Sequence, residues 1–85
     1  MIFTDGIHLI SDFSIDELHY FAQAIELKSH WFHSHPRHPH YDFTTSKDLT
    51  QSSRFLLRAL EWGAKMISSR DLVQIGIDVY KKEDV

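Results

Sequence analysis

The most chemically informative part of this 85-residue sequence is a short segment rich in histidine. Five of the seven histidines of the chain fall within eleven consecutive residues: His30, His33, His35, His38 and His40. The segment also holds both prolines of the chain, and it ends in His40-Tyr41-Asp42. Imidazole and carboxylate are the groups most used for metal binding and for proton transfer near neutral pH. Residues 33–42, here called the His/Pro loop, are therefore the predicted functional surface.

The spacing of these histidines favours a metal site. Residues two positions apart point to the same side of an extended strand, so His33 with His35, or His38 with His40, could bind one ion. These four histidines are the predicted metal ligands, and Asp42, His8 or His19 could supply a further one. Three protein ligands and a water are typical of catalytic zinc, and manganese also accepts imidazole with carboxylate. The alternative is a solvated loop that is merely rich in histidine.

A second interpretation is acid–base catalysis by His40 with Asp42. The two side chains are two residues apart, so Asp42 could orient the imidazole or act itself. Arg70 is the predicted clamp for a phosphate or carboxylate, and serines at the start of a helix would add backbone donors. The predicted substrate-binding residues are His8, Tyr41, Ser69 and Arg70. The structural alternative is that Tyr41 packs in the core, Asp42 caps a turn and His40 bonds a carbonyl.

Composition limits the classes of protein that this chain can belong to. Its length predicts one domain, residues 1–85, with a charged tail at 81–85. There is no cysteine, which excludes disulfides and thiolate metal sites. The N-terminal sequence lacks the features of a signal peptide and no segment is long and apolar enough to span a bilayer, so we expect a cytoplasmic protein without a membrane partner.

The net charge of −3 is unevenly distributed along the chain. Residues 1–27 contain five acids and no base, whereas residues 28–70 contain seven Lys or Arg and three acids. The middle of the chain is therefore expected to meet an anionic ligand, such as a nucleotide. A pI near 6 argues against duplex DNA as the main partner, and the sequence leaves the oligomeric state open.

Strand patterns alternate with helix patterns along the chain. Two apolar runs, 2–4 and 7–10, flank Asp5-Gly6 and predict a hairpin or one interrupted strand. Ser14 and Glu17 form a capping-box pattern that begins a helix to about residue 27. Further predicted elements are strands at 31–32, 41–44 and 64–67, a helix over 55–62 that ends at Gly63, a short helix from Ser68 or Ser69 to Val73, and a last strand at 77–80.

This alternation predicts an α/β fold. We expect a single small layered domain, with a short, partly parallel sheet of three to four strands flanked by two or three helices. The three aromatic residues Trp31, Phe32 and Trp62 are assigned to the core, and His19 to a partly buried position on the first helix.

Several fragments together resemble a family of short bacterial and phage proteins, the domain of unknown function 4031. The fragments are His8-Leu9-Ile10-Ser11-Asp12, Asp16-Glu17-Leu18-His19, Trp31-Phe32, Pro39-His40-Tyr41-Asp42, Ser46-Lys47, Gly63-Ala64 and Ser69-Arg70-Asp71-Leu72. The resemblance runs from about residue 7 to residue 73, and His-Tyr-Asp is its most specific element. It implies no activity, but it directs attention to His8, His19, His40, Asp42 and Arg70.

The sequence predicts a small enzyme that acts on a phosphate-bearing nucleotide or nucleic-acid substrate, by metal-assisted or histidine-based chemistry. The alternative is a non-catalytic module that binds a ligand or a protein, and a structural or oligomerisation domain is a third hypothesis. A PIN-like nuclease site, with Asp5, Asp12 and Asp71 around magnesium, is the least favoured hypothesis.

Overall fold

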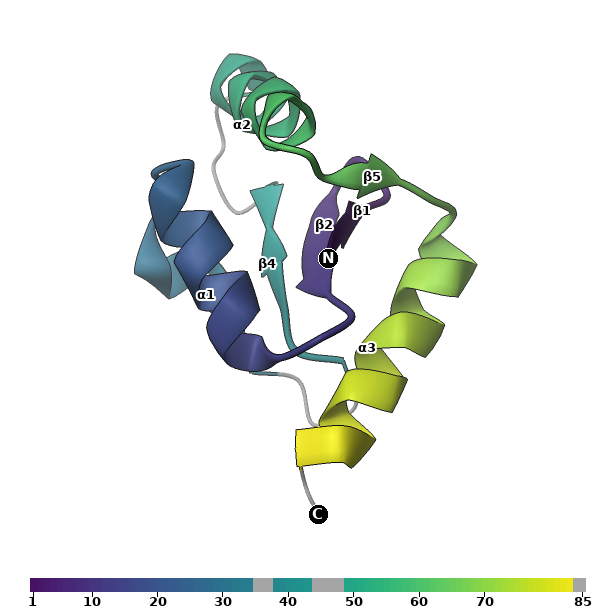
Figure 1. Cartoon of the computed structure of the whole chain (residues 1–85). Coiled ribbons are helices and arrows are strands. Elements are labelled where there is room, and N and C mark those ends of the chain that lie inside the picture. The colour runs from purple at the N-terminus through teal and green to yellow at the C-terminus, as the bar shows by residue number, and fades with distance from the viewer. Residues whose placement is uncertain (35–37, 44–48, 84–85) are drawn as a thin grey trace.

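A mixed β-sheet with helices on both faces organises the chain (Figure 1). The computed structural model describes residues 1–34, 38–43 and 49–83, with backbone alone at 49–52 and 80–83. Within these residues the sheet has five strands in the order β3-β4-β2-β1-β5. The strands are β1 (Ile2–Thr4), β2 (His8–Ser11), β3 (Phe32–His33), β4 (His40–Asp42) and β5 (Lys65–Met66). The helices are α1 (Ile15–Ala24), α2 (Leu49–Glu61) and α3 (Ser69–Glu83), and η1 (Ser29–Trp31) is a short 3-10 helix.

The sheet is antiparallel except at one pair. Strand β2 pairs antiparallel with β1 and with β4, β3 pairs antiparallel with β4, and β1 pairs parallel with β5. The α/β class and the partly parallel sheet are therefore confirmed, with one strand more than the predicted maximum of four. Strands β1, β4 and β5 run in the same direction, so their carboxyl ends lie at the edge where β2 begins.

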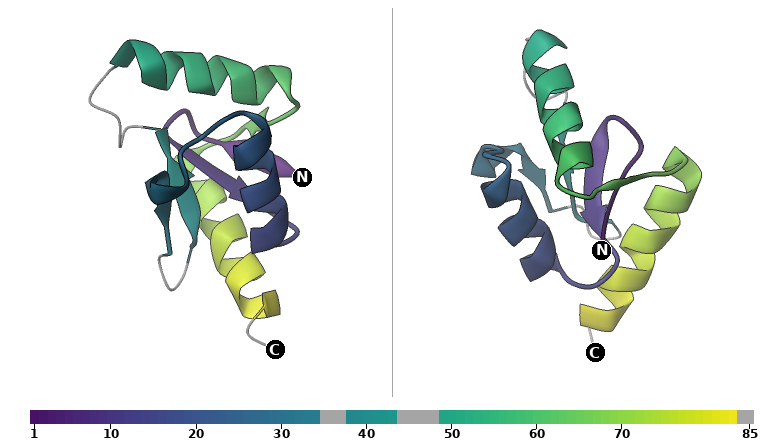
Figure 2. Two further views of the ribbon diagram at one scale, coloured as in Figure 1. Left: turned by 90° about the vertical axis from the view of Figure 1, so that its left-hand side faces the viewer. Right: turned by 45° about the horizontal axis from the view of Figure 1, so that its top comes forward.

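The register of the strands divides their side chains between two faces. His8 lies opposite Asp42 and His33 lies opposite His40, whereas Leu9 lies opposite Tyr41. Because side chains alternate along a strand, the histidines and Asp42 share one face and Leu9 and Tyr41 share the other. Helices α1 and α3 lie on opposite sides of the sheet (Figure 1), and α2 lies across the end at which β4 finishes (Figure 2).

The core lies mainly between the sheet, α1 and α2. Its buried members are Ile2, Leu9, Leu18, Ala22, Ile25, Leu27, Trp31, Tyr41, Phe43, Phe55, Ala59 and Ala64. Trp31 is buried and Phe32 packs against this cluster, as predicted. The core assignment of Trp62 is wrong, because 59% of this residue is exposed just after the end of α2.

Helix α1 begins at the predicted cap, Ser14, but ends at Ala24 rather than at about residue 27. The Ser14 hydroxyl accepts a hydrogen bond from the Glu17 amide at 3.0 Å, as a capping box requires. The Glu17 carboxylate accepts a hydrogen bond from the Ser11 hydroxyl at 2.7 Å, whereas the Ser14 amide donates to Ser11. At the other end Glu26 has φ +66°, and the Leu27 amide donates to the carbonyl of Ala22. This is a Schellman motif, which normally uses glycine.

Helix α2 ends in the same motif at Gly63, the residue predicted to end it. Gly63 has φ +102°, and its amide donates to the Leu60 carbonyl while the Ala64 amide donates to Ala59. A left-handed backbone suits glycine because it has no Cβ. The chain then turns back directly into β5.

The predicted last strand at 77–80 is wrong, because those residues belong to α3. The buried residues of this helix, Leu72, Gly76 and Val79, recur at helical spacing. One face of α3 therefore packs against the sheet. The helix continues to Glu83, so residues 81–83 are helical rather than part of a tail. The predicted strand at 41–44 is confirmed as β4 up to Asp42, and Thr44 lies outside the described residues.

Helix α3 packs closely on the His/Pro loop at one point. A Cβ built on Gly76 would lie 2.7 Å from the Cβ of His38 and 3.1 Å from its Cα. Glycine therefore allows α3 to approach the residue that precedes β4 by two positions. Among the described residues, no helix is both long enough and apolar enough to cross a lipid bilayer.

Candidate metal centre

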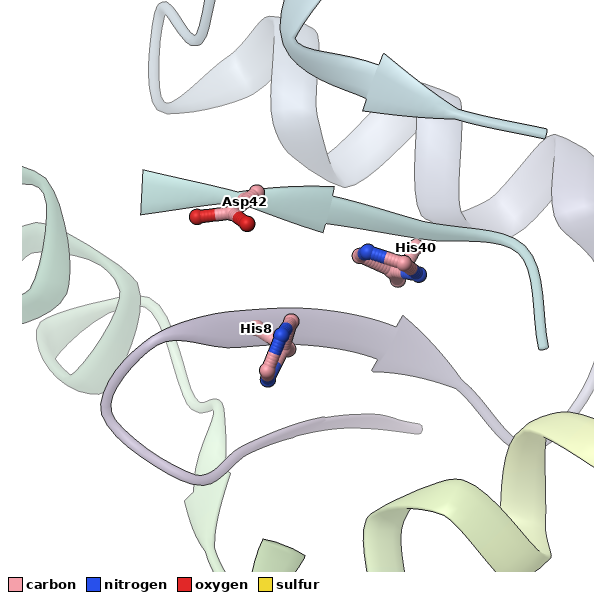
Figure 3. A group of neighbouring side chains, drawn as sticks. All are labelled: His8, His40 and Asp42. Atoms are coloured by element: carbon pink, nitrogen blue, oxygen red, sulfur yellow. The ribbon is translucent and has the colours of Figure 1, made fainter. Parts of the chain in front are cut away.

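Three side chains with metal-binding atoms converge on one face of the sheet: His8 from β2, and His40 and Asp42 from β4 (Figure 3). One ligand atom from each of them lies within 4.8 Å of the other two. The rings of His8 and His40 meet edge to face, with centroids 5.0 Å apart. All three side chains are partly buried, so they are held in place and still reachable from solvent. Ligands of zinc lie about 3–3.5 Å apart, so small side-chain rotations would close this group around an ion.

The β1–β2 hairpin positions His8. The Asp5 Oδ1 accepts the backbone amides of Ile7 at 2.9 Å and His8 at 2.7 Å, which fixes the turn. Gly6 between them has φ +98°. The Thr4 hydroxyl donates to the His8 carbonyl at 2.7 Å and accepts from the Gly6 amide at 3.1 Å. The aspartate-glycine pair therefore makes a tight turn that delivers His8 to the first position of β2.

Asp5 also determines which nitrogen of His8 is available. Its Oδ2 lies 2.9 Å from Nδ1 of His8 and accepts a hydrogen bond from the Ser69 hydroxyl at 2.7 Å. A carboxylate is an acceptor, so in the neutral ring the proton lies on Nδ1 and the lone pair on Nε2. Carboxylates that hold a metal-binding histidine in this way are a common second layer of metal sites.

The carboxyl of Asp5 is kept ionised by its surroundings. Its side chain is only 2% exposed, and burial favours the neutral acid. Hydrogen bonds from the ring and amide of His8, the Ser69 hydroxyl and the Ile7 amide outweigh this effect and hold the pKa of Asp5 well below its usual range. Asp5 is therefore a buried anion next to His8.

His40 is held in the same way by a backbone carbonyl. Its Nδ1 lies 2.8 Å from the carbonyl oxygen of His38, which can only accept, so Nε2 is again the unprotonated nitrogen. Burial lowers the pKa of the His40 ring below its usual value, and the nearby rings of His8, His33 and His38 lower it further. A neutral imidazole is the form that binds metal ions.

Two further histidines of the predicted ligand set lie beside this group. The His33 ring stacks on His40 with centroids 5.2 Å apart and planes 11° apart, and the His38 ring lies 5.6 Å from it. His33 is exposed, and neither side chain belongs to the converging group of three. His35 lies outside the described residues. Of the four predicted ligands, His40 alone is in that group.

The remaining predicted site residues lie in three different environments. Tyr41 is buried on the opposite face of β4, where its hydroxyl meets Nδ1 of His19 at 2.8 Å. His19 is partly buried, as predicted. Ser69 connects the start of α3 to the group through Asp5, and Arg70 is exposed in the first turn of the same helix.

Asp5 is the site residue whose role the sequence analysis missed, since it was considered there only as a magnesium ligand. The usable signal is its spacing, because an Asp in a tight turn commonly accepts amides two and three residues later. His8 is the third residue after Asp5, so the carboxylate that accepts its amide can also reach its ring.

Comparison with known families gives one result for most of the chain. Residues 5–78 match the model of a family described as protein of unknown function, DUF4031. Comparison with curated proteins gives no match, and neither does comparison with solved structures. The matched range includes every residue of the converging group as well as Asp5 and Ser69.

Proposed function

The chain belongs to DUF4031, a family of unknown function, and we propose that it works through a divalent metal ion bound by His8, His40 and Asp42. The observation that carries this proposal is the convergence of the three ligand atoms within 4.8 Å. It is supported by the two hydrogen bonds that place the proton of each neutral ring on Nδ1 and leave Nε2 to bind an ion.

The ligand types favour zinc, with manganese as the alternative. Two imidazole nitrogens and one carboxylate oxygen form a set that zinc uses in hydrolytic enzymes, and the chain has no thiolate to offer. Manganese prefers more oxygen ligands and would take them from water. Three protein ligands leave at least one position for water or substrate.

The proposed activity is hydrolysis of a phosphate-bearing substrate. A divalent ion lowers the pKa of a bound water and polarises a phosphoryl oxygen. In this proposal His40 and Asp42 act as ligands rather than as an acid–base pair, which differs from the interpretation of the sequence alone. Support for a phosphate comes from α3, whose amino end is connected to Asp5 through Ser69 and carries the exposed Arg70. A cytoplasmic location remains part of the proposal.

A metal titration tests the centre itself. Protein without an affinity tag is titrated with Zn²⁺ and Mn²⁺ by calorimetry, and one ion per chain is expected. His8→Ala, His40→Ala and Asp42→Ala should each weaken binding at least about tenfold, because each removes one ligand. The control is His30→Ala, which removes an exposed histidine of η1 outside the group and should leave affinity unchanged. Equal losses in His30→Ala and His40→Ala would reject the centre.

A turnover assay separates an enzyme from a binding module. The metal-loaded protein is incubated with bis(p-nitrophenyl) phosphate and with nucleoside monophosphates. Metal-dependent release of product, lost in Asp42→Ala and with a raised KM in Arg70→Ala, is expected. Tight metal binding without turnover of any of these compounds would reject the hydrolase and favour a non-catalytic module.

A further inference from the structure

Two large aromatic side chains are exposed on the α1 side of the molecule. Tyr20 of α1 is 78% exposed and Trp62 is 59% exposed. They line a hollow of about 320 Å³, together with Met1, Ile2, Glu17, Phe21, Ala24 and Gly63. Tryptophan and tyrosine on a concave surface are the residues most often responsible for binding energy in protein interfaces. Leu9 and Tyr41 lie on the face of the sheet that α1 covers. His8, His40 and Asp42 lie on the opposite face, so this hollow is separate from the candidate metal centre.

Negative charge exceeds positive charge around this hollow. Glu17 lies in its wall, where its carboxylate pairs with the amino terminus of Met1 at 2.6 Å. A second hollow, which shares Ala24 and Trp62 with the first, is lined by Glu26, Arg58 and Glu61. The Arg58 guanidinium donates to the Ile25 carbonyl at 2.9 Å and to Glu26 at 3.3 Å, so Arg58 and Glu26 form an ion pair. Three carboxylates therefore meet two cations in these hollows, and Glu61 supplies the excess negative charge. We call these two adjoining hollows the acidic aromatic groove.

The charge and shape of this groove define what would bind there. We propose that the acidic aromatic groove binds a basic segment of a partner protein, with an apolar side chain beside Trp62 and Lys or Arg side chains facing Glu61 and the exposed Glu26. Complementary charge steers such a segment and fixes its register. Lysine and arginine also bind favourably over the faces of Trp and Tyr rings. A nucleic acid, in contrast, would bring its phosphates against Glu17, Glu26 and Glu61.

Intrinsic fluorescence can detect an occupant directly. The chain has two tryptophans, of which Trp31 is 3% exposed and Trp62 is 59% exposed, so quenching by acrylamide reports mainly on Trp62. The probes are synthetic pentapeptides with two lysines on each side of a central leucine, isoleucine or phenylalanine. Binding of at least one of them should shift the emission to the blue and protect Trp62 from acrylamide. Peptides with glutamate in place of lysine are the charge-reversed controls.

Variants of the full chain locate the binding surface by calorimetry. Trp62→Ala and Glu61→Gln should weaken lysine-peptide binding, the first by about tenfold or more. Leu57→Ala is the matched control, because Leu57 is 61% exposed on α2 but lines neither hollow. Higher salt should weaken binding of the wild type more than that of Glu61→Gln.

Four results would overturn the proposal. They are no binding of any lysine peptide, equal binding of glutamate peptides, Trp62 protection that depends on protein concentration alone, and protection by an oligothymidylate. Protection that depends on protein concentration alone would indicate that a second copy of the chain covers the groove. Protection by an oligothymidylate would indicate that the groove binds a nucleic acid. None of these results bears on the metal centre, because the peptide titrations are made without added metal.

Discussion

Replacement of Asp5 by asparagine tests how the metal-binding form of His8 is maintained. The Oδ1 of Asp5 accepts two backbone amides, so the side-chain oxygen of the introduced asparagine must stay in that place. The asparagine NH₂ group then replaces Oδ2 and faces Nδ1 of His8 and the Ser69 hydroxyl. Since an amide NH₂ is only a donor, His8 must move its proton from Nδ1 to Nε2 to keep this hydrogen bond. The change therefore blocks the nitrogen that is proposed to bind the metal.

The size of the effect follows from these contacts. Loss of such an outer carboxylate typically lowers metal affinity about 10- to 100-fold. Two of the four hydrogen bonds to Asp5 are kept, and the hydroxyl of Ser69 can rotate to accept instead of donate. The folding cost should therefore be limited to about 1–3 kcal/mol, the typical cost of one mismatched buried polar group. The variant should fold, so that its loss of metal affinity can be measured on the native protein.

Two measurements check this prediction. Zinc affinity is obtained by competition with a chelator, and the proton position on His8 is read from ¹⁵N chemical shifts of the metal-free protein. The wild type should show His8 protonated on Nδ1, and Asp5→Asn should show protonation on Nε2. Asp78→Asn, which changes an exposed carboxylate of α3 that does not belong to the converging group, is the control and should change neither quantity. An Asp5→Asn variant with wild-type affinity and an unchanged His8 would refute the reasoning.

Three further predictions concern acidity, the opposite face of the sheet and the contact between α3 and the His/Pro loop. The pKa of His40 is lowered in the folded state, so below about pH 6.5 the unfolded chain binds more protons than the folded protein does. The unfolding free energy of the metal-free protein should therefore fall as the pH drops through this value. Urea unfolding at several pH values checks this, and His40→Gln should flatten the dependence. Tyr41→Phe removes the hydrogen bond to His19 and should cost about 1 kcal/mol of stability with no change in metal affinity, since Tyr41 is on the other face. Gly76→Ala should cost about 1–3 kcal/mol by overpacking and should also weaken metal binding, because its Cβ displaces His38, whose carbonyl orients His40. A thermal melt and a zinc titration of the same sample test both parts, and a stable variant with normal affinity would contradict the contact.

Most of the fold could be predicted from local sequence signals. Ser14 and Gly63 mark a helix start and a helix end through short-range hydrogen bonds and backbone preference. The length of α3 could not be predicted in this way, since residues 75–79 are mostly apolar and fit a short strand as well as a helix. The exposure of Trp62 was also missed, because the orientation of α2 against the sheet decides which side of the helix end is covered.

The candidate site was predicted only in part, for a physical reason. His40 and Asp42 are two residues apart in one strand, so their shared face follows from the sequence. His8 joins them only through the pairing of β2 with β4, which no local pattern specifies. The high histidine content of the His/Pro loop favoured His33, His35 and His38 as metal ligands. Composition alone does not show which imidazole rings have a nitrogen directed at a common point.

X-ray absorption at the zinc edge tests the proposed metal centre most directly. For protein loaded with one equivalent of zinc, we expect two imidazole nitrogens and oxygen ligands at about 2.0–2.2 Å, with one imidazole fewer in His8→Ala and in His40→Ala. A zinc environment without imidazole, or one that is unchanged in both variants, would contradict a metal centre formed by His8, His40 and Asp42.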